Sequence, residues 1–185
     1  VVLLVAAQAP SSLEVDADFA YGFGSRSAFG VLAGGAARWP LYEGRLARGE
    51  VEAGLLGGWQ TESYDATAAL LLPSVVSGAN HRIELFAVGG HTVSFLESRR
   101  LQVGLLLFAG ATHLTMRGAV SNAPQGINRT FAADATEFTF GFVFRAGFRI
   151  TRHVGVVARF VLPVPWAGVA ISSYFMASVG LTVSW

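Results

Sequence analysis

The sequence predicts an all-β protein, a transmembrane antiparallel up-and-down β-barrel of eight strands. Apolar residues alternate with small or polar residues over long stretches, as in strands whose two faces meet different surroundings. Hydrophobic residues make up 52% of the 185 residues and charged residues 14%, whereas a soluble domain has about 25% charged residues. No run of about 18 uninterrupted apolar residues occurs, so we expect the chain to cross a membrane with strands rather than a helix.

The clearest alternation occupies the last eighteen residues, Gly168 to Trp185. From Val169 onward, the odd positions are mostly apolar and the even positions mostly Gly, Ser, Tyr and Thr. A final amphipathic strand that ends on an aromatic residue resembles the C-terminal signature of bacterial outer-membrane β-barrels. In that family the barrel assembly machinery reads the aromatic terminus, usually a Phe. The resemblance implies an assembly signal made of Phe175, Val179, Leu181, Val183 and Trp185.

Seven further segments alternate in the same way and are separated by turn-forming residues. We expect strands over residues 13–23, 28–41, 50–62, from His81 to a turn near Glu97, and over residues 101–113, 138–150 and 154–162. The segment 116–135, which is rich in Gly, Asn and Pro, is interpreted as a loop. The segment 63–79 is interpreted as a strand extended past the membrane, a lid or a contact surface.

The first residues suggest export. Residues 1–9 are similar to the end of an apolar signal segment, with an Ala-x-Ala cleavage site at Ala7 to Ala9. We therefore expect a signal-peptide remnant over residues 1–9 and a single barrel over residues 10–185. The alternative is that residues 1–5 form the beginning of a strand.

The number and spacing of the strands extend the resemblance to the small OmpA/OmpX-type barrels. Bacterial barrels have even strand numbers, short periplasmic turns and longer outer loops. The expected connections after strands two, four and six are shorter than those after strands three and five. The resemblance implies location in the bacterial outer membrane, where aromatic residues gather at both membrane surfaces. The residues expected in these girdles are Trp39, Tyr42, Trp59, Tyr64, Trp166 and Trp185.

If the apolar faces contact lipid, the charged residues face the lumen. An eight-stranded barrel is just wide enough for side chains to fill it, and an unpaired buried charge is costly. We therefore expect a network of ion pairs, in which Arg holds carboxylates in a bidentate manner. A structural network is favoured over a gated polar path. The expected members are Glu14, Asp16, Asp18, Arg38, Glu50, Glu52, Glu62, Arg82, Glu84, Arg145, Arg149 and Arg159.

The function favoured by the sequence is a non-enzymatic structural or interaction component of the cell envelope with a largely closed lumen. One alternative is a narrow channel or a conduit for hydrophobic compounds. Another is a lipid A-modifying hydrolase that uses His113 with Thr115, although no Ser nucleophile lies beside this His. A soluble lipocalin-like barrel would instead place the apolar residues inside.

No cofactor or metal is expected. The chain has no Cys, and His81, His91 and His153 are too scattered in the sequence to suggest a metal site. The net charge of +1 gives no reason to expect nucleic acid. The expected partners are outer-membrane lipid or lipopolysaccharide, the barrel assembly machinery, and another envelope protein. The contact surface expected for that envelope protein is formed by Leu70, Leu71, Leu72, Val75 and Val76.

Overall fold

The computed structural model describes residues 9–23, 28–68, 74–95, 100–122, 125–164 and 175–185. Several expectations fall outside these residues: nearly all of the signal remnant, Leu70 to Leu72, Trp166, and the first part of the expected last strand, 168–174.

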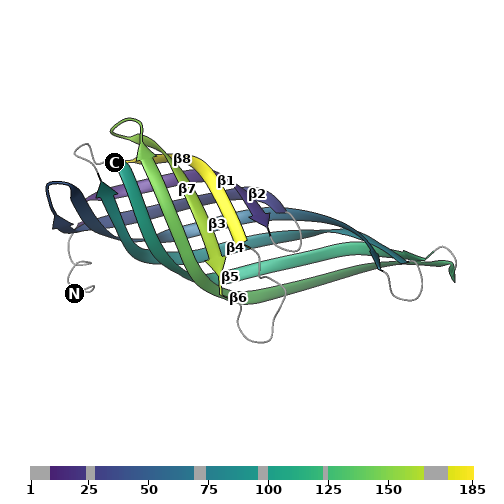
Figure 1. Cartoon of the computed structure of the whole chain (residues 1–185). Coiled ribbons are helices and arrows are strands. Elements are labelled where there is room, and N and C mark those ends of the chain that lie inside the picture. Colours follow the sequence, from purple (N-terminus) through teal and green to yellow (C-terminus); the bar gives the residue numbers. More distant parts are fainter. Residues whose placement is uncertain (1–8, 24–27, 69–73, 96–99, 123–124, 165–174) are drawn as a thin grey trace.

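Eight strands in the described residues form one closed antiparallel barrel (Figure 1). Each strand pairs with its neighbours in the sequence, and the last strand pairs with the first. The predicted fold class is therefore confirmed. The strands are β1 (Ser12–Phe23), β2 (Ala28–Glu43), β3 (Ala47–Ala68), β4 (Ser74–Phe95), β5 (Leu101–Asn122), β6 (Ile127–Arg149), β7 (Val154–Pro163) and β8 (Phe175–Ser184).

The barrel is apolar outside and charged inside. Phe19 points outward and is 81% exposed, whereas Arg38 points inward and has no exposed surface. Burial alternates residue by residue along β5 and β7, because successive side chains point to opposite faces of a strand. A soluble lipocalin-like barrel would show the reverse distribution, so this distribution identifies a transmembrane barrel. No helix in the described ranges is long and apolar enough to span a membrane.

Four neighbouring strands are much longer than the others. β3, β4 and β5 have 22 residues each and β6 has 23, whereas β1, β7 and β8 have 12, 10 and 10. The long strands continue past the rest of the barrel at one end (Figure 1). We call this part the extended sheet; it comprises residues 63–68, 74–79, 117–122 and 127–132, which pair strand to strand.

The extended sheet corrects one sequence-based expectation. The prediction of a loop over 116–135 was wrong: β5 continues to Asn122 and β6 begins at Ile127, and the two strands are paired up to that turn. The segment 63–79 is largely strand on both sides of its connection, as in the first of its three interpretations. Hydrogen bonds to neighbouring strands compensate for the weak strand preference of Gly and Asn here.

The two ends of the barrel differ. One end, which we call proximal, carries the C-terminal residue Trp185 and the turns β2–β3, β4–β5 and β6–β7 (Figure 1). Two of these turns are closed by short backbone hydrogen bonds, Gly44 N to Ala47 O at 2.9 Å and Ile150 N to Val154 O at 2.9 Å. The extended sheet lies at the opposite, distal end. The proximal and distal ends give the direction in which the positions of charged side chains along the lumen are described below.

Candidate functional site

The lumen of the proximal half is built around three carboxylates of β1. Glu14, Asp16 and Asp18 occupy alternate positions, so all three side chains point inward, and each is at most 5% exposed. Three buried carboxylates on one strand require cations from other strands.

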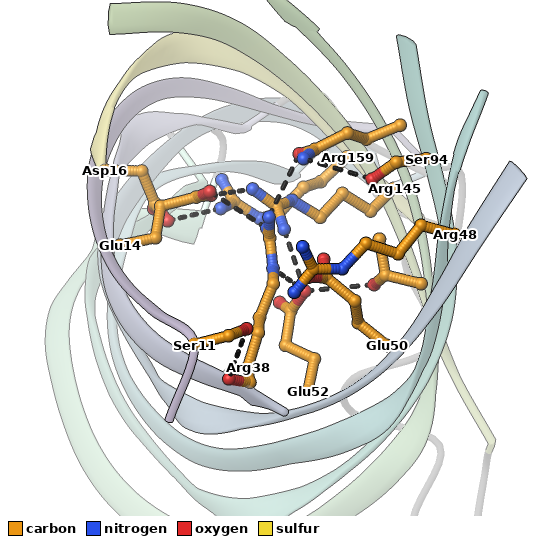
Figure 2. Close-up of polar contacts among 12 residues, drawn as sticks. Ser11, Glu14, Asp16, Arg38, Arg48, Glu50, Glu52, Ser94, Arg145 and Arg159 are labelled. Carbon is orange, nitrogen blue, oxygen red and sulfur yellow. Dashed lines mark hydrogen bonds and ion pairs between the residues drawn. The ribbon is translucent and has the colours of Figure 1, made fainter. Parts of the chain in front are cut away.

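Arg38 and Arg145 each form ion pairs with both Glu14 and Glu52, so these four side chains form a closed cycle of ion pairs. Arg38 Nη2 lies 2.9 Å from Glu14 Oε2, and Arg38 Nε lies 2.8 Å from Glu52 Oε2. Arg145 also contacts both carboxylates, through Nη2 to Glu14 and through Nη1 to Glu52 at 2.9 Å. These side chains converge inside the ring of strands (Figure 2). The cycle therefore links β1, β2, β3 and β6 across the lumen.

Arg159 of β7 neutralises the other two carboxylates of β1. Its Nη2 pairs with Asp16 Oδ2 and its Nη1 with Asp18 Oδ2. Ser178 of β8 donates a 2.7 Å hydrogen bond to the same Asp18 oxygen. Four carboxylates and three guanidinium groups thus share the proximal lumen. Such a network holds the strands in register and leaves little charge unopposed.

An apolar layer separates this network from the distal lumen. Its members are apolar side chains that point inward from each of the eight strands, and they pack as one cluster. Phe86 and Phe108 are in contact at its centre, with ring centroids 4.7 Å apart. The members are Ala20, Leu32, Leu56, Phe86, Leu106, Phe108, Val143, Val161 and Met176, with Val88 packed against them.

A second polar group lies on the distal side of the apolar layer. Gln60 Nε2 donates to Glu84 Oε2 at 3.2 Å and also approaches Met176 Sδ at 2.7 Å. Asn80 Nδ2 donates to Glu62 Oε2 at 3.3 Å. Arg82 is buried at this level, next to Gln60 in the strand register. The apolar layer therefore lies between this group and the β1 carboxylates.

The structure therefore divides the twelve charged residues expected in the lumen. It brings together Glu14, Asp16, Asp18, Arg38, Glu52, Arg145 and Arg159. It places Glu62, Arg82 and Glu84 on the other side of the apolar layer. Glu50 pairs with Arg48 at 3.0 Å near the proximal mouth, and Arg149 lies half-buried at that end.

Sequence reasoning missed the neutral members of the site. Gln102 accepts from Arg38 Nη1 at 3.0 Å, and Thr92 Oγ1 donates to Glu52 at 3.0 Å. Their inward position could have been inferred from strand parity. The apolar layer also left a signal, because residues 101–113 are apolar on both faces and Leu106 and Phe108 lie on the inner one.

The histidine considered for catalysis lies on the outer face. His113 is exposed, and its Nδ1 is 2.8 Å from Oγ1 of Thr136 on β6 rather than from Thr115. His81 stacks on Trp59 and His91 on Tyr42. Within the described residues, no group of three or more His, Cys, Asp or Glu side chains could hold a metal ion.

The residues expected to act in assembly lie on the outer face near the C-terminus. Trp185 is 65% exposed, and its backbone pairs with Leu13 of β1 in both directions. All five residues of the expected assembly signal face outward: Phe175, Val179, Leu181, Val183 and Trp185. The role of these residues in assembly remains a prediction.

Two of the residues expected to contact a partner lie in the extended sheet. Val75 is 41% exposed on its outer face, and Val76 is half-buried on its inner face. Leu70, Leu71 and Leu72 belong to the connection between β3 and β4, outside the described residues.

Solved structures share this architecture. A major outer membrane protein from Thermus thermophilus is 11% identical, with 92% of this chain and 99% of that chain covered and a TM-score of 0.57. The fold is that of an outer-membrane β-barrel. The expected resemblance to the OmpA/OmpX type is thus confirmed for the fold.

Two more likenesses have lower scores. The outer membrane protease OmpT from Escherichia coli is 9% identical, with 95% and 97% covered and a TM-score of 0.50. Ail, the attachment invasion locus protein of Yersinia pestis, is 11% identical, with 96% and 100% covered and a TM-score of 0.46. At these identities the likeness concerns the fold alone. No protein-family model and no curated protein matches the sequence.

Proposed function

We propose that this protein is a non-enzymatic barrel of the bacterial outer membrane with a closed lumen, and that the extended sheet docks a segment of another envelope protein. The observation that carries the docking role is the outer edge of β6. From Ile127 to Thr136, no strand in the described residues pairs with this edge, whereas β7 pairs with β6 from Gly141 onward.

The lumen supports a structural role. The charge network fills the proximal half, and the apolar layer lies directly beyond it. Between them, a cavity of about 20 Å³ is lined by Asp16, Glu52 and Arg159 together with apolar side chains. That space suits about one water molecule rather than a row of hydrated ions.

The exterior supports a non-enzymatic role. His113 is 2.8 Å from a Thr hydroxyl, but in the common catalytic triads a third group, usually a carboxylate, orients the His ring. No carboxylate hydrogen-bonds to His113 in the part of the chain that the structure describes.

The backbone at the free edge of β6 is oriented to accept another strand. Val164 N donates to Phe140 O at 2.8 Å, so the backbone groups of Phe140 point toward the β7 side. Arg149 N donates to Arg100 O, so odd-numbered residues of β6 point toward β5. Because directions alternate along an antiparallel strand, the even residues Asn128 to Thr136 present their N–H and C=O groups at the free edge.

The two faces beside this edge define the chemistry of the partner segment. Ile127 and Phe131 lie on the inner face, on either side of the exposed Arg129, and are 39% and 37% exposed. Asn128, Thr130 and Asp134 lie on the outer face and are exposed. The segment that fits is an extended chain with apolar side chains on one face and polar side chains on the other, added by β-augmentation.

A proline at an even position of β6 tests the proposal. Thr130→Pro removes an outward N–H without removing a bond to β5, whereas Thr130→Ala keeps that N–H. A photoreactive p-benzoylphenylalanine at Ala132 is used in cells to report a bound protein. We expect a cross-linked product of higher mass, retained with Thr130→Ala and reduced at least several-fold with Thr130→Pro.

The same photoreactive residue at Ala109, on the outer face of β5 within the barrel, is the positional control. Any cross-linked product formed from position 109 should be equally abundant with Thr130→Pro and with Thr130→Ala. Equal cross-linking at Ala132 with Thr130→Pro and Thr130→Ala would remove the docking role.

A further inference from the structure

The proximal turns carry exposed arginines on several sides of the barrel. Arg45 lies in the β2–β3 turn, Arg100 immediately precedes β5, and Arg152 lies in the β6–β7 turn. All three are exposed. Within the described ranges, one acidic residue at this end, Glu43, is exposed, against the three arginines. Glu50 is buried there and pairs with Arg48. The proximal rim therefore has an excess of positive charge.

The backbone holds these arginines at a defined level. The β2–β3 turn is closed by the bond from Gly44 N to Ala47 O. Arg100 O accepts a 2.9 Å hydrogen bond from Arg149 N of β6. In the β6–β7 turn, Thr151 Oγ1 accepts from Val154 N at 3.0 Å, which fixes the tight turn around Arg152.

Each arginine adjoins the apolar outer surface. Leu46 follows Arg45 and is 68% exposed, and Leu101 follows Arg100 and is 38% exposed. Ile150, two residues before Arg152, is 53% exposed. The apolar surface of a transmembrane barrel ends where the hydrocarbon of the bilayer ends, and the phosphates of the headgroups lie directly beyond that boundary. A guanidinium group at this level is within reach of those phosphates, with which it forms bidentate hydrogen bonds.

The distribution around the barrel identifies the kind of partner. The three turns alternate with the strands around the ring, so the arginines are spread over all three proximal connections (Figure 1). A protein bound beside the barrel would meet one or two of these turns. Lipid surrounds the barrel and meets all of them.

We propose that Arg45, Arg100 and Arg152 form a collar that binds the phosphate headgroups of anionic phospholipids around the proximal end. Each arginine near an anionic membrane surface adds on the order of fivefold to binding at moderate ionic strength. The collar selects lipids with a net negative charge, such as phosphatidylglycerol, over zwitterionic lipids. This interaction is independent of the docking role proposed for β6.

Spin-labelled lipids measure this selectivity directly. The purified barrel is reconstituted in phosphatidylcholine vesicles that contain a trace of spin-labelled phosphatidylglycerol or spin-labelled phosphatidylcholine. Electron paramagnetic resonance gives the fraction of each label immobilised at the protein surface. We expect a several-fold preference for phosphatidylglycerol, which weakens at high salt because ions screen charges at the surface.

The triple variant R45Q/R100Q/R152Q should lose this preference. The matched control R117Q/R129Q removes two exposed arginines of the extended sheet and should retain it. A heat-modifiable band on a gel verifies that each variant is folded, and R152Q alone, which should lose part of the preference, replaces the triple variant if that fails to fold. Equal association of the two lipids with the unchanged protein, or an undiminished preference in the folded R45Q/R100Q/R152Q or R152Q variant, would overturn the proposal.

Discussion

Arg38 illustrates how single residues hold this barrel together. Its guanidinium is fully buried and contacts Glu14, Glu52 and Gln102, which come from three different strands. A charge in such a place is tolerated because its hydrogen-bonding groups meet acceptors. Removing it would leave two buried carboxylates with Arg145 as their remaining arginine in the network.

Replacement of Arg38 by Met should therefore destabilise the barrel strongly. Breaking a buried ion pair from one side costs about 3–5 kcal/mol because the other charge is left without compensation. The measurement is the free energy of unfolding in urea, with the protein inserted in phospholipid vesicles. Arg117→Gln, an exposed position on the extended sheet, should change this free energy by less than about 0.5 kcal/mol.

A second substitution isolates the interaction between Arg38 and Glu14 from the other contacts of Arg38. Arg38→Met combined with Glu14→Gln removes one charge of each sign, so part of the lost stability should return. A double-mutant cycle should then give a coupling free energy of about 0.5–3 kcal/mol between these two residues. Additive effects would contradict the direct pairing of Arg38 with Glu14.

Strand parity made the inward charges of β1 predictable, because side chains alternate with a period of two residues. The partners could not be predicted in the same way. Glu14 meets Arg145, which lies far away in the sequence on β6. Such a contact depends on how the barrel closes and on the shear between strands, neither of which is encoded by spacing within one strand.

The long strands β5 and β6 show a second limit at the scale of elements. Gly118, Asn122, Gly126 and Asn128 suggested a loop, yet only Gly126 has a positive φ, 64°, in the turn itself. The other three lie in paired strand. Pairing with a neighbouring strand outweighs local preference here, so turn-forming residues located the turn but not its length.

Contacts between strands should make β4 and β5 sensitive to a single added methyl group. A Cβ at Gly110 would lie 2.0 Å from Leu85 O and 2.8 Å from Leu85's neighbour Phe86 Cα, both backbone atoms. Gly110→Ala should therefore force the strands apart and cost about 1–3 kcal/mol, as other overpacked sites do. Urea unfolding in vesicles measures this loss.

Gly57→Ala is the matched control for Gly110→Ala. A Cβ at Gly57 would meet its nearest heavy atom, Glu84 O, at 3.6 Å, an ordinary contact distance. This substitution should leave the stability unchanged or raise it slightly, since Ala loses less conformational freedom on folding than Gly. Equal losses at both positions would show that the glycines are needed for another reason.

At the scale of the whole molecule, two barriers of different chemistry lie in series along the lumen. We expect the charge network to oppose the passage of ions because its groups are already paired, and the apolar layer to oppose it because it offers no hydrogen-bonding groups. A path for ions would have to cross both. Removing either barrier alone should consequently leave the other in place.

Conductance across planar bilayers tests this arrangement. The unchanged barrel should show no steady single-channel steps. Phe86→Ser with Phe108→Ser removes the centre of the apolar layer, and Glu52→Ser with Arg145→Ser removes one carboxylate and one guanidinium of the network. Each pair of substitutions should remain silent, and the four together should conduct, provided that a heat-modifiable band verifies folding. Steady steps from the unchanged protein would instead support the narrow channel over the closed structural barrel, since ions would then pass both barriers as they stand.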